Sequence, residues 1–222
     1  MLTRRTALGA LLSPLVLAGC GFGGGESYRY RMTVVVDTPQ GPRTGSSVIE
    51  VRGRSTGPLA ASAFTRRARG EAVFVDLPGG HTLFALLSSP SNGYDAAGLY
   101  PVLAYESTLP PGHDWHQEFE GLKREREPAL LPSDAYPRLI TFRDPKDAKS
   151  IEVVDPADLA AVFGPGIALK NIEIAITSDP VTKKLSSRLP DFGPSSGYVQ
   201  WASQLPSGDP RSLSLDELQR DA

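Results

Sequence analysis

The sequence predicts an α+β protein that is rich in β-structure, with a mostly antiparallel sheet and two or three short helices on one face. Three observations carry this prediction: an alternation of apolar and polar residues over 28–36, two hairpin signals, and an amphipathic helical pattern over 114–127. We expect one globular β-rich domain over residues 28–190. A β-sandwich decorated with helices is the alternative arrangement.

The first strand has the clearest pattern. Its period of two and its β-branched residues are typical of a strand with one buried face, formed by Tyr28, Tyr30, Met32, Val34 and Val36. A turn over 38–42 contains two prolines, and residues 46–52 return as the antiparallel partner. Residues 53–70 show no period, so we predict an exposed loop there.

Two hairpins are expected next. Residues 71–77 and 82–87 flank the turn Pro78-Gly79-Gly80, and the continuous apolar run in the second arm is typical of a strand covered on both faces. Residues 138–143 and 149–154 form the second pair, around a turn over 144–147.

The helix over 114–127 has Asp114 at its N-cap position and Gln117 three residues later, which approximates a capping box. Residues 94–105 have room for a short helix that is interrupted at Pro101. Another short helix is predicted to start at Asp155 and to stop at the glycines of 164–166.

The last predicted strand covers residues 167–176, and its alternation slips at Lys170-Asn171, which predicts a bulge. Residues 191–222 are rich in serine, glycine and proline and predict a loosely ordered tail. Within that tail only residues 214–219 are expected to form a helical turn, with Ser214 and Glu217 in capping positions.

The N-terminus has the layout of an export signal: Arg4 and Arg5, an apolar run over 7–18, and small residues before Cys20. Leu17-Ala18-Gly19-Cys20 resembles the lipobox of bacterial lipoproteins. The resemblance implies that residues 1–19 are a signal peptide and that Cys20 carries fatty acyl chains such as palmitate. Residues 20–27 would then be a lipidated cysteine and a flexible tether, and the membrane would be a partner through that lipid.

Two further features concern export and destination. Residues 3–8 are similar to the twin-arginine signal, although Ala7 replaces the expected aromatic residue, so the general secretory route remains equally open. By resemblance to lipoproteins, Gly21 after the cysteine favours the outer membrane over the inner one. We therefore expect a lipid-anchored protein on the periplasmic side of the bacterial cell envelope.

Composition excludes several classes of site. Cys20 is the only cysteine, so its acylation leaves none for disulfides or for cysteine-based zinc sites. No other stretch approaches the roughly 20 apolar residues of a transmembrane helix. The net charge is −2, yet residues 26–70 carry +5 and residues 71–222 carry −9.

The basic part suggests a contact with an anionic membrane or envelope polymer, for which Arg66, Arg67 and Arg69 are the candidate residues. A solvated loop that only keeps the protein soluble is the competing interpretation. We expect no nucleic-acid partner. A protein partner in the envelope is the other candidate.

His113 and His116 are the weak candidates for a metal site, with Asp114 or Glu118 as a third ligand, whereas a solvated helix entry is the simpler interpretation. No nucleophile elbow or phosphate-binding glycine loop is present, and no cofactor is expected. Residues 44–51 are similar to segments of uncharacterised bacterial proteins, which implies no mechanism.

Together these observations favour a membrane-anchored envelope lipoprotein that acts as a non-enzymatic binding or assembly module. The alternative is an envelope hydrolase whose site assembles around His113 and His116. A third hypothesis is an immunity or inhibitor protein, which would present a large exposed apolar patch.

Overall fold

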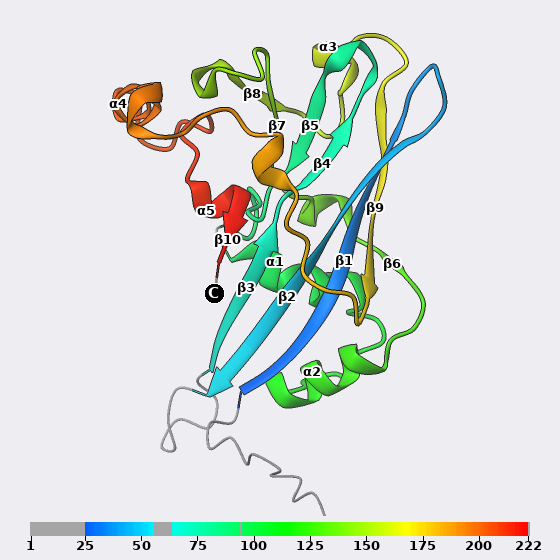
Figure 1. Cartoon of the computed structure of the whole chain (residues 1–222). Coiled ribbons are helices and arrows are strands. Elements are labelled where there is room, and N and C mark those ends of the chain that lie inside the picture. The colour runs from blue at the N-terminus through cyan, green and yellow to red at the C-terminus, as the bar shows by residue number, and fades with distance from the viewer. Residues whose placement is uncertain (1–24, 56–63, 94, 222) are drawn as a thin grey trace, which may run out of the picture.

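The computed structural model describes residues 25–55, 64–93 and 95–221 and has an α+β architecture with two mostly antiparallel sheets (Figure 1). The predicted signal peptide, Cys20 and most of the predicted tether lie outside these residues. The larger sheet has six strands, in the spatial order β10 (Gln219–Arg220), β3 (Phe64–Glu71), β2 (Arg43–Ser55), β1 (Gly25–Asp37), β9 (Ala168–Ile176) and β6 (Ala129–Leu130).

Strand β1 lies at the centre of this sheet and follows the predicted alternation. Tyr30, Met32 and Val34 are fully buried, while the residues between them face outward. β1 pairs antiparallel with β2 and with β9, which confirms the predicted partner. Val35 pairs with Asn171 but Val36 pairs with Leu169, so Lys170 is the extra residue of the predicted bulge.

Two helices cover one face of the six-stranded sheet: α1 (Ala96–Ala104) and α2 (Trp115–Arg124). α1 runs through Pro101 without the predicted interruption, because the Tyr30 hydroxyl donates to the Ala97 carbonyl oxygen that an N–H at position 101 would otherwise reach. α2 begins at a complete capping box between Asp114 and Gln117, as predicted. Phe119 of α2 is fully buried and packs edge-on against Tyr28, with ring centroids 4.9 Å apart. Gly53 permits this close packing, because a Cβ there would lie 2.8 Å from the Phe119 ring.

The smaller sheet has four antiparallel strands, and both predicted hairpins are present in it. Its spatial order is β4 (Val73–Asp76), β5 (Thr82–Ala85), β7 (Leu139–Phe142) and β8 (Ile151–Val154). β4 runs against β2 at Gly45, where a Cβ would lie 1.8 Å from the carbonyl oxygen of Phe74. Leu139 and Val154 join the main core with β1, whereas Ile140 and Phe142 face a second core.

The second core is formed with the C-terminal segment, and here the structure differs from the predicted loose tail. Tyr198, Leu213 and Leu218 are buried against the smaller sheet. The segment contains α4 (Tyr198–Ala202), α5 (Leu215–Leu218) and β10, and α5 has the predicted capping box. The ordered domain therefore extends to residue 221 and is not limited to 28–190.

Other boundaries also differ from the sequence predictions. Residues 53–55 and 64–70 belong to β2 and β3, so the whole described part of the predicted 53–70 loop is strand. β1 begins at Gly25, within the predicted tether. α3 (Ala160–Phe163) begins later than predicted, because Asp155 accepts from the Ala157 N–H in a turn that precedes the helix. The 3₁₀ turns are η1 (Pro78–Gly80), η2 (Ser133–Ala135), η3 (Ala148–Ser150), η4 (Leu185–Ser187) and η5 (Pro194–Ser196).

Candidate functional site

The outer face of the six-stranded sheet, opposite α1 and α2, carries six arginines that we call the arginine face. Strand alternation places them there, because each is flanked in its strand by residues that face the core. Figure 1 views the molecule from this side, with β1, β2 and β3 in front of α1. The arginine face consists of Arg29, Arg31, Arg52, Arg54, Arg67 and Arg69.

The strand register places like charges opposite one another. Arg52 lies directly across from Arg67, and Arg54 lies across from Gly25. Glu50 offsets part of this charge through ion pairs with Arg52 at 2.8 Å and Arg69 at 3.7 Å. No described carboxylate lies within ion-pair distance of Arg54 or Arg67, and both side chains are exposed.

The arginine charge is more fully neutralised further along β1. Asp179 pairs with Arg31, and its backbone oxygen accepts a 2.7 Å hydrogen bond from Arg29. Asp179 belongs to the segment 177–185, which crosses in front of β1 and β2 in Figure 1. The open, least neutralised part of the arginine face is therefore the part nearest the start of β1.

The three arginines predicted as one contact do not share a surface. Arg67 and Arg69 face outward, but Arg66 faces the helices, where it pairs with the buried Glu118 of α2. The Arg66 guanidinium also lies 5.1 Å from the ring centroid of Phe64. Arg66 thus connects β3 to α2 and does not belong to the arginine face. From the sequence, only Arg67 and Arg69 of that face were predicted as contact residues.

The two candidate histidines have different partners. His113 Nδ1 lies 2.8 Å from the carbonyl oxygen of Pro110, whereas His116 Nδ1 lies 2.6 Å from Oε1 of Glu26. Partial burial opposes ionisation of Glu26, but hydrogen bonds from His116 and Lys123 outweigh it and lower the Glu26 pKa. Among the residues that the structure describes, no group of three or more His, Cys, Asp or Glu side chains could hold a metal ion.

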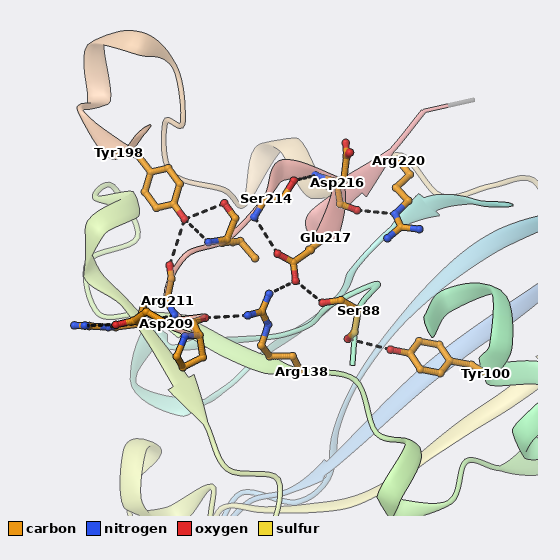
Figure 2. A network of polar contacts seen from close by, with 12 residues as sticks. Ser88, Tyr100, Arg138, Tyr198, Asp209, Arg211, Ser214, Asp216, Glu217 and Arg220 are labelled. Carbon is orange, nitrogen blue, oxygen red and sulfur yellow. Dashed lines mark hydrogen bonds and ion pairs between the residues drawn. The ribbon is translucent and has the colours of Figure 1, made fainter. Parts of the chain in front are cut away.

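A cavity of about 630 Å³ lies where β7 and β8 meet the C-terminal segment, and the sequence did not predict it. Arg138, Ser88 and Glu217 are among the residues that line it, and Figure 2 shows them in one polar network. Glu217 is 2% exposed and pairs with Arg138, while its Oε1 accepts a 2.5 Å hydrogen bond from the Ser88 hydroxyl. Its Oε2 accepts from the Ser214 N–H at 2.9 Å, which completes the capping box of α5.

This network fixes the C-terminal segment to the smaller sheet. Arg138 also donates to the carbonyl oxygen of Pro210 at 3.1 Å, and Tyr100 donates to the Ser88 carbonyl oxygen at 3.1 Å. The Ser88 hydroxyl donates a hydrogen bond to a carboxylate whose charge is already balanced by Arg138, which makes Glu217 a weak base for activating the hydroxyl. From the sequence, Glu217 was predicted only as a capping residue, and no local pattern identifies its second partner.

No protein-family model, no curated protein and no solved structure matches this chain. None of the helices in the described ranges has the length and apolar character needed to cross a membrane.

Proposed function

We propose that this chain is a lipid-anchored envelope protein that acts as a non-enzymatic binding or assembly module, with its arginine face held against the anionic membrane surface. One observation carries the proposal. The least neutralised end of the arginine face begins where the chain enters the fold, because Gly25 lies opposite Arg54 and Ser27 lies opposite Arg52. The lipobox-like cysteine lies only five residues before Gly25.

The short connection keeps the arginine face near the lipid. The five residues from Cys20 to Gly25 span at most about 18 Å, which is roughly two Debye lengths of about 8 Å at physiological salt. Basic side chains near an anionic leaflet contribute about 1 kcal/mol each. Two or more acyl chains on Cys20 anchor the protein stably without help, so the arginine face would orient the domain rather than retain it.

This orientation leaves the cavity accessible. In Figure 1 β1 begins at the lower end of the domain, whereas β7 and β8, which line the cavity, lie in the upper half. A domain held by its lower end would present the cavity towards the periplasm, and Gly21 favours the outer membrane as the site of attachment. The hydrolase hypothesis has less support: His113 lies 3.7 Å from Glu118 and His116 lies 2.6 Å from Glu26, so the two histidines have separate carboxylate partners.

The anchor is tested by cell fractionation. We expect the mature-length product of the Cys20→Ser variant, without residues 1–19, to lose its sedimentation with membranes, because the arginine face alone binds weakly and in a salt-dependent way. Retention of the variant in the membrane fraction at 0.5 M salt, in the amount seen for the unchanged protein, would contradict the anchor.

The arginine face is tested separately with lipid vesicles. The full chain carrying Cys20→Ser is bound to vesicles with 30% phosphatidylglycerol and to vesicles of phosphatidylcholine alone, and the two partition coefficients are compared. The triple variant R52Q/R54Q/R67Q should lower the anionic preference on the order of 100-fold, at about 1 kcal/mol per arginine. A matched variant, R143Q/R188Q/R211Q, removes the same charge elsewhere and should change it less than threefold. Equal losses in both variants would refute a role for this face.

A further inference from the structure

The edge strand β8 has unused backbone hydrogen-bonding groups. β8 ends the smaller sheet, and no strand of the described chain pairs with its outer edge. The N–H of Arg143 donates to the carbonyl oxygen of Ser150 at 3.2 Å, which sets the phase of the β7–β8 ladder. In an antiparallel pair these bonds recur at every second residue. Ile151 and Val153 therefore direct their N–H and C=O groups away from β7. Val153 is the more accessible of the two, because it is 37% exposed whereas Ile151 is 5% exposed.

A groove runs along this edge. The cavity of about 630 Å³ at one end and a second cavity of about 650 Å³ at the other are both lined by Val153 and Pro210. The second cavity also extends along residues 150–152 and the Asp209–Arg211 pair, so the segment 208–211 forms the opposite wall. The Val153 side chain is 37% exposed and gives the groove an apolar centre.

We propose that this groove binds an extended peptide of another protein, which adds an antiparallel strand to β8. Strand addition at a free edge takes its affinity from main-chain hydrogen bonds and its specificity from the side-chain surroundings. β8 has four residues, and one flanking residue at each end of the guest would reach the charged groups beside the strand. The contact would therefore involve a peptide of about six residues, about 20 Å long at roughly 3.4 Å per residue. The proposal names a ligand class for the binding module above and in that respect rests on the proposed function.

The charges along the groove fix the polarity of the peptide. At the C-terminal end of β8, Asp134 and Asp155 line the cavity, and neither has an ion-pair partner among the described residues. At the N-terminal end Lys149 is the cation without such a partner, because Arg143 pairs with Glu152. An antiparallel guest strand has its N-terminal end beside Asp155 and its C-terminal end beside Lys149. The groove therefore fits a peptide with a basic residue first and an acidic residue last.

A second copy of the chain is the competing occupant. The β8 strand of a second copy would match the same charges in an antiparallel arrangement. However, the 208–211 segment of the second copy would then lie against the 208–211 segment of the first copy. A single peptide strand avoids this conflict, so the groove is better suited to a peptide than to edge-to-edge dimerisation.

The test uses the full chain carrying Cys20→Ser in mild detergent and two fluorescent peptides, acetylated and amidated at their ends. One has lysine first, glutamate last and alternating threonine and valine between them; the other has the two charged residues exchanged. Anisotropy titrations should show about tenfold tighter binding of the lysine-first peptide, since both end contacts change from attraction to repulsion in the other. Lys149→Glu should reduce that preference to less than threefold.

Val153→Pro removes the outward N–H without removing a bond to β7 and should weaken binding at least tenfold. The matched variant Val153→Thr keeps that N–H and should bind within twofold of the unchanged protein. The proposal is overturned if neither peptide binds at millimolar concentration, or if the proline and threonine variants bind alike. It is also overturned if sedimentation shows a dimer that Val153→Pro dissociates, which would assign the edge to a second copy.

Unchanged tryptophan fluorescence and urea midpoints in the proline variant establish that it folds. If it does not fold, the Lys149→Glu result decides alone, because that side chain is exposed and has no partner in the described structure. No membrane is present in this experiment, so its failure leaves the vesicle test of the arginine face unaffected.

Discussion

Replacing Arg67 by glutamate should make the fold more stable and its binding to anionic membranes weaker. Arg67 lies directly opposite Arg52, and like charges in this position are destabilising, whereas opposite charges contribute roughly 0.2–1 kcal/mol. Losing the repulsion and gaining the attraction would together contribute about 0.4–2 kcal/mol. Arg52 already pairs with Glu50 at 2.8 Å, which reduces the expected gain to about 0.5–1 kcal/mol. The face also loses two units of positive charge, worth about 2 kcal/mol near an anionic leaflet, or roughly 30-fold in binding.

Urea unfolding followed by tryptophan fluorescence measures the first effect, and partition to phosphatidylglycerol vesicles measures the second. The matched control is Arg143→Glu, which changes the charge equally but faces Glu152 across a bidentate pair. We expect the control to lose a little stability and to keep its vesicle binding. The reasoning is refuted if Arg67→Glu destabilises the fold, or if both variants weaken vesicle binding to the same extent.

Three other predictions concern the fold. Glu217→Gln should destabilise the protein by about 3 kcal/mol in urea unfolding, because it removes the buried carboxylate that pairs with Arg138; a loss below 1 kcal/mol would contradict the role given to this network. Gly45→Ala should cost more stability than Gly53→Ala, whose own loss is about 1–3 kcal/mol, since a backbone carbonyl of β4 cannot move as far as an aromatic ring. The lowered pKa of Glu26 means that its contribution is present above its unfolded value of 4.5 and is lost as the pH falls through the folded pKa. Lys123→Met should raise that pKa towards 4.5 in a carboxyl NMR titration, and an unchanged pKa would exclude the ion pair as a cause.

Local patterns predicted the elements whose signals lie within a few residues. The alternation of β1, the capping box at Asp114 and the bulge at Lys170 depend on neighbouring side chains and backbone geometry, so the sequence contains them directly. The β3 strand was missed because Arg66 occupies an inward position of its alternation. Its burial depends on Glu118, which is 52 residues away in the chain.

The C-terminal segment was mispredicted for a related reason. Its glycines, prolines and serines suggest a loose chain, yet Tyr198 and Leu218 fill a core whose other half comes from β5 and β7. Glu217 is held by Ser88 and Arg138, which lie 129 and 79 residues away. The cavity and the groove along β8 arise from this long-range docking, so no local pattern could indicate them.

The segment 177–185 connects the end of β9 to the second core. Its contacts explain which arginines of the arginine face have a carboxylate nearby. It is fixed at one end by Asp179 to the arginines of β1 and at the other by Glu71, whose Oε2 accepts hydrogen bonds from the Lys184 and Leu185 N–H groups. Asp179 therefore offsets the charge of arginines that lie further from Gly25. Arg54, opposite Gly25, has no described carboxylate within ion-pair distance. The same segment leads into the second core through Leu185. The chain then continues to residues 208–211, which line the groove along β8.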